Sequence, residues 1–401
     1  MTTNTKQNDL RELAEEAVRR GLDFFVRNQI RDTQSADHGR FPYVYDCETN
    51  APVNLTTNWT TGVVVSALLA GYRHTGDKAY LEAAGRGCEY IKSLQEFAPE
   101  HAPLQGVFHE VTPQSDKAHP RDALTAAWAL LDYSLIVDDQ VGIERAKIYA
   151  DWFVETGCEK GFPYWTVQFD GNPWYPTWCG SFHSGSAFFM YRLYSITGEE
   201  KYLKTMRLIL DFYNSNHIDG QGQITVVVDR ETQEGISGED ARGTAPINWQ
   251  VMHHYNDDFG ALANLAAWKV TGEDSYRDSA MAFFGRMCAS QYDHGGFGSE
   301  TLCVPSAGGA IVIEMLAARE LGLQRAEYDA AIERAIPYLL GLQKVAPDNP
   351  ADGAFFGMTG DYQLSDSIAN SRTAAYAIMG LIRYAGSRNE IYFLDGKSAD
   401  A

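Results

Sequence analysis

The sequence predicts an all-α protein built from six helical hairpins, and two features carry this prediction. A turn of the form Thr-Gly-acid, followed by a helix with an early tyrosine, recurs at residues 74–84, 196–206 and 270–280. Looser copies lie at 9–17, 137–147 and 321–331. Copies spaced by roughly sixty residues indicate one supersecondary unit per repeat. The apolar residues also follow a helical period, which divides the chain into about twelve helices.

Half of these helices are apolar on nearly every side, which is typical of helices buried all round. They are expected at residues 58–75, 120–137, 181–197, 254–271, 305–321 and 368–386. The other half carry one apolar and one charged stripe, and are expected at residues 8–30, 76–95, 140–157, 199–216, 273–290 and 325–343. We therefore predict an inner ring of buried helices within an outer ring of amphipathic helices.

The connections alternate between short and long. The short ones carry the Thr-Gly-acid turn, in which glycine closes one helix and the acid begins the next. The long ones span residues 31–57, 96–119, 158–179, 217–252, 291–304 and 344–367. Many of these open with a glutamine and then a Gly-aromatic step, and we expect short strands or hairpins there. The alternation over 220–236 predicts a β-hairpin. Loops of this length in a compact domain are usually functional.

The composition limits the class of protein. A net charge of −20 argues against binding nucleic acid or an anionic membrane. No apolar run has the length of a membrane span, and the polar N-terminus lacks the features of a signal peptide, so we expect a cytoplasmic protein. We expect one domain over residues 1–401 and no cofactor. The oligomeric state stays open.

The six cysteines are scattered, and none forms a Cys-x-x-Cys pair. Trp178-Cys179-Gly180 with His183 resembles the zinc site of lanthionine cyclases, but the second cysteine of that site and its neighbouring histidine are missing. We therefore predict no metal.

The long loops and the N-termini of the inner helices should meet at one mouth. Helix N-termini present free N–H groups and a positive dipole end, which suit an anionic or hydroxyl-rich ligand. The mouth is therefore the expected pocket.

The densest polar cluster in the sequence opens the fourth inner helix. One aspartate there is explained by helix capping, but a run of six polar residues is not. Two adjacent carboxyl groups repel each other when both are charged. The pKa of one is therefore raised, and that group can act as an acid near neutral pH. We predict that the cluster lines the active site. It consists of His253, His254, Tyr255, Asn256, Asp257 and Asp258.

Other polar candidates begin the neighbouring inner helices. Arg121 and Asp122 follow His119-Pro120, where the alternative is an ordinary helix start with a surface arginine. His183 is a candidate ligand contact. Asn370 and Arg372 open the last inner helix; Arg372 would bind a substrate carboxylate or, alternatively, pair with Asp361 or Asp366.

Aromatic residues crowd the long loops. We assign at least half of them to packing, but rings interspersed with polar groups are also what a sugar-binding cleft needs. The candidate sugar contacts are Trp59, Trp165, Trp174, Trp178 and Phe297, with Glu300 as a further acid.

The pattern of six hairpins resembles the (α/α)6 toroid of carbohydrate-active enzymes over nearly the whole chain, and is most like unsaturated glucuronyl hydrolases. In those hydrolases a catalytic aspartate precedes an inner helix, and Asp122 matches its position. Their second aspartate is not matched, because His183 and Ser184 occupy that segment. The resemblance implies a small-molecule carbohydrate substrate.

We therefore expect a glycoside hydrolase acting on oligosaccharides, including uronides. Asp257 or Asp258 would donate a proton, and another acid (Asp122, Glu300 or Asp366) or a histidine would orient water.

Three other enzyme classes on this fold remain open, as does a non-enzymatic glycan-binding role. A polysaccharide lyase would use Tyr255 or a histidine as base and Arg372 to neutralise a uronate. A terpenoid cyclase needs Asp-x-Asp-Asp, but Tyr255 stands at the first acid. The histidine motifs of sugar 2-epimerases are not matched.

Overall fold

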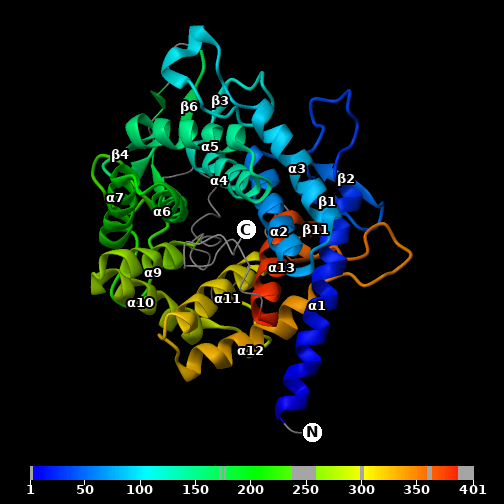
Figure 1. The fold of residues 1–401 in the computed structure, drawn as a ribbon. Helices are drawn as coiled ribbons and strands as arrows, with labels where there is room; N and C mark the ends of the chain where they lie inside the picture. The colour runs from blue at the N-terminus through cyan, green and yellow to red at the C-terminus, as the bar shows by residue number, and fades with distance from the viewer. Residues whose placement is uncertain are drawn as a thin grey trace. The chain divides into compact units, whose positions relative to one another are not determined.

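Figure 1 shows the computed structural model, which describes residues 3–170, 174–175, 178–236, 259–298, 302–358 and 364–386. The described chain falls into two compact units. The first contains residues 3–56, 63–88 and the described residues from 287 onward, and the second contains 57–62 and the described residues of 89–286.

The inner helices are confirmed. They are α2 (Asn58–Thr75), α4 (Pro120–Val137), α6 (Ser186–Thr197), α9 (Gly260–Thr271), α11 (Pro305–Glu320) and α13 (Ser371–Ala385). In α11 every residue from Pro305 to Ala318 is buried, as an apolar surface on all sides predicts. The 3-10 helix η3 (Ser181–Gly185) leads into α6.

The amphipathic helices are also confirmed. They are α1 (Thr3–Asn28), α3 (Lys78–Ser93), α5 (Gln140–Trp152), α7 (Glu200–Asn216), α10 (Asp274–Ser290) and α12 (Ala326–Gly341). In α7 the buried residues follow helical spacing along a single stripe: Tyr202, Thr205, Met206, Ile209, Leu210 and Tyr213. A π-helical turn, η2 (Phe153–Gly157), extends α5.

The tyrosine of the Thr-Gly-acid repeat ties its helix to the preceding amphipathic helix. In each copy its hydroxyl donates a hydrogen bond to an aspartate, over 3.0, 2.6 and 2.7 Å respectively. The pairs are Tyr80 with Asp23, Tyr202 with Asp151, and Tyr276 with Asp211. The repeat therefore joins one hairpin to the next.

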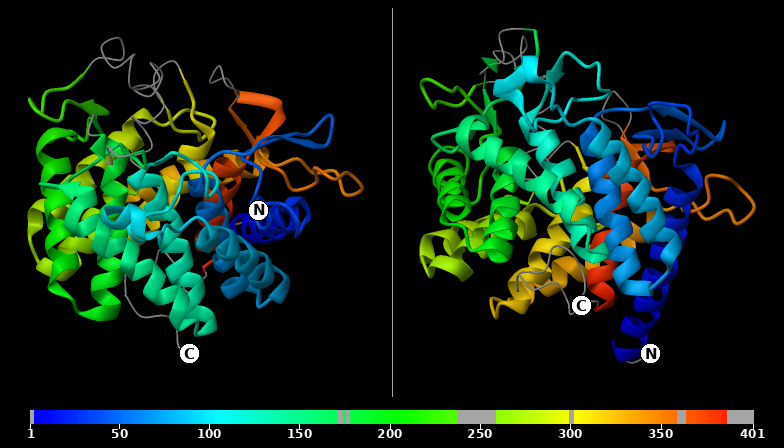
Figure 2. Two further views of the ribbon diagram at one scale, coloured as in Figure 1. Left: turned by 90° about the horizontal axis from the view of Figure 1, so that it is seen from above. Right: turned by 45° about the horizontal axis from the view of Figure 1, so that its top comes forward.

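Short antiparallel strands occupy the long connections, as predicted (Figure 2). In the first unit, a four-stranded sheet has the order β10 (Phe356–Met358), β11 (Leu364–Asn370), β1 (Val44–Asp46), β2 (Ala51–Asn54). In the second unit, β3 (Lys117–Ala118) pairs with β6 (Thr166–Gln168), which pairs with β7 (Trp174–Tyr175). Two further pairs are β4 (Cys158–Glu159) with β5 (Phe162–Pro163), and β8 (Cys179–Gly180) with β9 (Val227–Val228).

The hairpin expected over 220–236 is present, but few residues pair across it. Val228 bridges Gly235, and the Ile236 amide donates to the Val227 carbonyl at 2.9 Å. The intervening DRETQE segment forms the turn. Strand β9 also pairs with β8, so this hairpin is joined to the segment that leads into η3.

The glutamine of the long connections has a structural role that we name the glutamine lock. Gln95 Nε2 donates to the carbonyl of Gly106 in its own loop, at 2.9 Å, and to that of Arg145 on the next amphipathic helix, at 3.0 Å. Gln29, Gln291 and Gln343 make the same pair of bonds to Gly39 and Ala83, Gly295 and Ala331, and Gly353 and Ala17.

The glycine of the connection lies against the backbone of a neighbouring helix. Gly295 has φ +94°, and a Cβ built on it would stand 1.9 Å from the Arg334 carbonyl oxygen. Gly161, in a connection without the glutamine, meets Leu208 in the same way. Only glycine fits both the positive φ and this close approach.

Within the part of the chain that the structure describes, none of the helices combines the length and the apolar character that crossing a membrane requires.

We expect Gln95→Ala to lower the free energy of unfolding by about 2 kcal/mol, because the carbonyls of Gly106 and Arg145 lose a buried donor. Urea unfolding measures the change. The matched control is Gln140→Ala, an exposed glutamine at the start of α5, which should change stability by less than ~0.5 kcal/mol. Equal effects from the two variants would contradict the lock.

Candidate active site

Two carboxyl groups lie close together at the start of α4 in the second unit. Glu110, in the loop after α3, is 2% exposed, whereas Asp122, in the first turn of α4, is partly exposed. Burial is the main reason why the pKa of Glu110 lies well above its usual value, and the charge of Asp122 raises it further. Both effects favour the protonated form of Glu110.

The protonated state of Glu110 also fits its hydrogen bonds. Oε2 accepts the backbone N–H of His119 at 2.8 Å. Oε1 is buried and makes no hydrogen bond within the described residues. A buried carboxyl oxygen without a donor favours the neutral form of Glu110.

The backbone around Glu110 is fixed by a buried asparagine. Asn58, at the start of α2 and within the second unit, donates from its backbone N–H to the Glu110 carbonyl at 2.9 Å. Its Nδ2 donates to the His109 carbonyl at 3.0 Å. The Glu110 amide donates to the carbonyl of Lys117, the first residue of β3, at 3.0 Å. These bonds hold the loop against the start of α4.

His119 stands between the carboxyl pair and the tryptophan-rich third loop. Its Nδ1 lies 3.0 Å from the Trp165 carbonyl, which only accepts, so Nδ1 carries the proton. Burial lowers the pKa of His119, and the charge of Asp122 opposes this shift. The ring is thus held as a neutral imidazole, with Trp165 at 5.0 Å edge-on.

Four of the other sequence-predicted residues come together beside Asp122: Arg121, Trp165, Trp178 and His183. The Trp165 ring lies 4.6 Å from that of Trp178 and 6.0 Å from that of His183. Trp178 and His183 are 3% and 1% exposed, whereas Trp165 is partly exposed and has the most accessible ring of the three.

Arg121 is not a surface arginine. It is 7% exposed, its Nε donates to the Phe182 carbonyl at 3.1 Å, and Nη1 donates to Thr125 Oγ1. The guanidinium therefore fixes η3 against α4. Tyr149 supports the same turn, because its hydroxyl donates to the Pro120 carbonyl at 2.5 Å.

In the first unit, the candidate residues take part in packing, helix capping or ring contacts. Phe297 is 1% exposed, which leaves its ring no accessible face for a sugar. Asn370 caps α13, its Oδ1 accepting the amides of Arg372 at 2.9 Å and Thr373 at 3.3 Å. The Arg372 guanidinium lies 5.8 Å above the Tyr376 ring.

Two further tryptophan candidates lie in the second unit. Trp59 is the second residue of α2 and is partly exposed. Trp174 belongs to β7, where its backbone pairs with Val167. The cluster His253, His254, Tyr255, Asn256, Asp257 and Asp258 lies outside the described residues, as does Glu300.

Sequence reasoning missed Glu110 as a site residue. Its signal was present in the segment Gln-Gly-Val-Phe-His-Glu (105–110), which we interpreted only as a Gly-aromatic step leading to a strand. The glutamate lies two residues after Phe108, close to the point where the lock holds the chain. The backbone of a titratable residue at this place is held in a fixed position before α4 begins.

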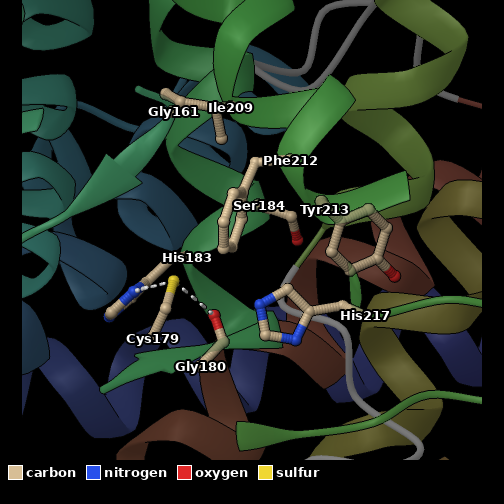
Figure 3. Close-up of a pocket in the computed structure, with 9 residues that line it drawn as sticks. All are labelled: Gly161, Cys179, Gly180, His183, Ser184, Ile209, Phe212, Tyr213 and His217. Carbon is tan, nitrogen blue, oxygen red and sulfur yellow. Dashed lines mark hydrogen bonds between the residues drawn. The ribbon is translucent and has the colours of Figure 1, made fainter. Parts of the chain in front are cut away.

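Beside η3 lies a small cavity (Figure 3). Its volume of ≈ 10 Å³ is at the lower limit of the roughly 10–15 Å³ that one water molecule needs, so it does not hold a sugar. Cys179 Sγ lies 3.1 Å from His183 Nδ1, and burial raises the pKa of the thiol. Across the described ranges, with their gaps, no three His, Cys, Asp or Glu residues are placed to hold a metal ion.

No family model and no curated protein matches the sequence. Solved structures do match the fold. The unsaturated glucuronyl hydrolase from Bacillus sp. GL1, responsible for the degradation of glycosaminoglycan, has a TM-score of 0.70 at 15% identity, covering 96% of this chain and 100% of that one. Cellobiose 2-epimerase from Spirochaeta thermophila has a TM-score of 0.71 at 15% identity, covering 96% and 98%.

A third similar structure is the α-1,6-mannanase from Salegentibacter sp., with a TM-score of 0.64 at 16% identity, covering 94% of this chain and 99% of that one. All three have the six-hairpin fold. The predicted all-α (α/α)6 toroid with short β-hairpins in its loops is therefore confirmed.

His217 makes the stability of the fold sensitive to acid. It is buried, its Nδ1 donates to the Thr225 carbonyl at 2.7 Å, and burial lowers its pKa from 6.5 to about 4. The unfolded chain then binds a proton that the folded chain excludes. Stability should fall as the pH drops from 6.5 to about 4, by roughly 3 kcal/mol in total.

His217→Asn keeps a donor for Thr225 but does not titrate. Urea unfolding across this pH range should show a flatter dependence for His217→Asn than for the unmodified protein. His294→Asn, at an exposed histidine, is the control and should leave the slope unchanged. If the stability of His217→Asn depends on pH as steeply as that of the unmodified protein, then His217 also binds its proton in the folded state.

Proposed function

We propose that the protein is a glycoside hydrolase that acts on oligosaccharides, including uronides, and that Asp122 is one of its catalytic carboxylates. The observation that carries the proposal is the pairing of a partly exposed Asp122 with a buried Glu110 of raised pKa. Carboxyls whose environments separate their protonation states are typical of acid and base assignments. The similar mannanase and glucuronyl hydrolase support the reaction class.

In this proposal Asp122 acts as the base. Its carboxylate takes a proton from water as the water oxygen bonds to the anomeric carbon. The glycosidic bond breaks, and its oxygen takes a proton from a second acid, for which Asp257 or Asp258 remains the candidate. Glu110 is too close to Asp122 to be that acid, since hydrolases place their two carboxyls on opposite sides of the bond.

Glu110 acts through Asp122 in this proposal. As a neutral carboxyl it borders Asp122 without adding a second negative charge. Trp165 offers the partly exposed ring on which a sugar stacks. For an unsaturated uronide the same residues act, and the proton from the second acid goes to the enol-ether double bond.

We expect Asp122→Asn to lower kcat/KM by roughly 10²–10⁴-fold, because the amide cannot accept the proton of water. The assay incubates the protein with uronic-acid-containing and mannose-containing oligosaccharides and separates the products. New reducing ends indicate hydrolysis, a new unsaturated-uronide absorbance indicates a lyase, and isomerisation without cleavage indicates an epimerase. Full activity of Asp122→Asn would refute this role.

Glu110→Gln provides a sharper comparison, because glutamine keeps a neutral donor in nearly the same shape. We expect it to retain activity within about tenfold of the unmodified enzyme. If Glu110 instead donates its proton in the reaction, Glu110→Gln will be as inactive as Asp122→Asn. Glu100→Gln, at an exposed acid of the same loop, is the control.

The activity should also fall at high pH. The raised pKa of Glu110 keeps it protonated above the usual 4.5, and activity is lost as the pH rises through the folded-state pKa, where a second charge appears beside Asp122. Glu110→Gln cannot ionise and should extend the upper limit. A pH–rate profile of both proteins measures the difference, and identical upper limits would count against the assignment.

A further inference from the structure

A buried histidine presents an acceptor to the cavity beside η3. His217 is 2% exposed, and its Nδ1 lies 2.7 Å from the Thr225 carbonyl oxygen, which only accepts. Nδ1 therefore carries the proton, and Nε2 keeps a lone pair. Nε2 is buried and makes no hydrogen bond within the described residues. A buried acceptor in this state destabilises the fold, so a donor is expected at Nε2.

The His217 ring is held so that this acceptor faces the cavity. The Thr225 amide donates to the His217 carbonyl at 2.7 Å, which completes a pair of bonds between the two residues. The Tyr213 ring is stacked on the imidazole, with centroids 5.9 Å apart and planes 27° apart. In Figure 3 the edge of the imidazole that carries Nε2 points toward Cys179 and Gly180.

The Gly180 carbonyl is a second acceptor on the cavity wall. In the β8–β9 pair, Ser181 is at a hydrogen-bonded position, because its amide donates to the Val226 carbonyl at 2.7 Å. Bonded and non-bonded positions alternate along an antiparallel pair, so the carbonyl of Gly180, opposite Val227, points away from β9. It lies 3.7 Å from Cys179 Sγ. A thiol is a weak donor, so this carbonyl can accept a second, stronger hydrogen bond.

The rest of the lining adds one hydroxyl and two apolar side chains. Ser184 Oγ donates to the Ser181 carbonyl at 2.7 Å, and its oxygen can accept as well. Ile209 and Phe212 line the apolar side, where the Phe212 ring is stacked on that of Phe162 with centroids 5.2 Å apart. The cavity therefore suits a very small ligand that brings two donors.

We propose that this cavity binds one water molecule, which donates one proton to His217 Nε2 and the other to the Gly180 carbonyl oxygen. The volume of ≈ 10 Å³ admits a single water and nothing larger. The two acceptors, with Ser184 Oγ nearby, are within the two to four polar partners that a buried water needs. This inference goes beyond the proposed function and does not depend on it.

The water joins two segments that the described side chains leave without a polar contact at this point. Strand β8 leads into η3, and His217 begins the turn after α7. Arg121 already fixes η3 from the α4 side through the Phe182 carbonyl. The water supports the same segment from the α7 side, so that η3 is held between two inward-facing polar contacts.

A metal ion fits this lining less well than water. Burial raises the pKa of the Cys179 thiol well above its usual value, so the sulfur stays protonated and is a poor metal ligand. Across the ranges that the structure describes, no three His, Cys, Asp or Glu residues are placed to hold a metal.

The first measurement is a crystal structure of the full chain at a resolution that orders solvent. We expect one water in the cavity, roughly 2.7–3.2 Å from both His217 Nε2 and the Gly180 oxygen. An empty cavity, or a protein donor on Nε2, would overturn the proposal. An anomalous signal with bond lengths of about 2.0–2.3 Å would also overturn it, because it indicates a metal ion.

The second measurement observes the contact in solution by ring ¹⁵N NMR, with His217 assigned by comparison with His217→Asn. We expect a proton on Nδ1, a hydrogen-bonded Nε2, and magnetisation transfer from a long-lived water to the ring protons. Ser184→Thr keeps the hydroxyl and adds one methyl group to the lining. It should displace the water, move the Nε2 resonance to its unbonded position, and raise the unfolding equilibrium constant by about tenfold.

Ser195→Thr is the matched control. Ser195 is an exposed serine of α6 whose hydroxyl also donates to a backbone carbonyl, that of Tyr191 at 2.9 Å. It should leave the Nε2 resonance unchanged. If a folded Ser184→Thr also leaves it unchanged, the protein itself satisfies the acceptor and the proposal is wrong. If Ser184→Thr does not fold, the transfer from water in the unmodified protein decides, and its absence rejects the site.

Discussion

The bond on which the rest of the structure depends is the one from a buried glutamine to two backbone carbonyls. Such a carbonyl, left without a donor, destabilises the fold, and one side-chain amide satisfies two of them at once. Gln95 closes its own loop at Gly106 and attaches it to α5 through Arg145. The same arrangement at Gln29, Gln291 and Gln343 shows that hairpins are joined by a repeated polar contact as well as by apolar packing.

The lock and the proposed site are continuous along the chain. Glu96 follows the lock glutamine, and His109 and Glu110 follow the Gly106 step. The segment therefore places two carboxyl groups and an imidazole at positions fixed by scaffold bonds. Rigid support of this kind is what holds catalytic groups in a productive geometry. Arg121 extends it by holding η3 against the start of α4.

The helices were predictable because their signals are local. Apolar periodicity defines α7 and α11 within one stretch of sequence, and the Thr-Gly-acid turn separates neighbouring helices. Asp122 was predictable because it begins a helix after proline. Glu110 was not, because its raised pKa arises from burial and from Asp122, twelve residues further along the chain (122 − 110). The burial of Phe297 and the capping of α13 by Asn370 also became visible only in three dimensions.

The glutamine lock has a consequence for how the loops can change. Between the glutamine and its glycine the sequence separation is 10, 11, 4 and 10 residues at the four locks. The same two bonds thus close segments of very different length. The contact with the neighbouring helix is the same in each case. The stretch between the two lock residues is therefore a permissive insertion point, where new recognition segments can be added while the hairpins keep their geometry.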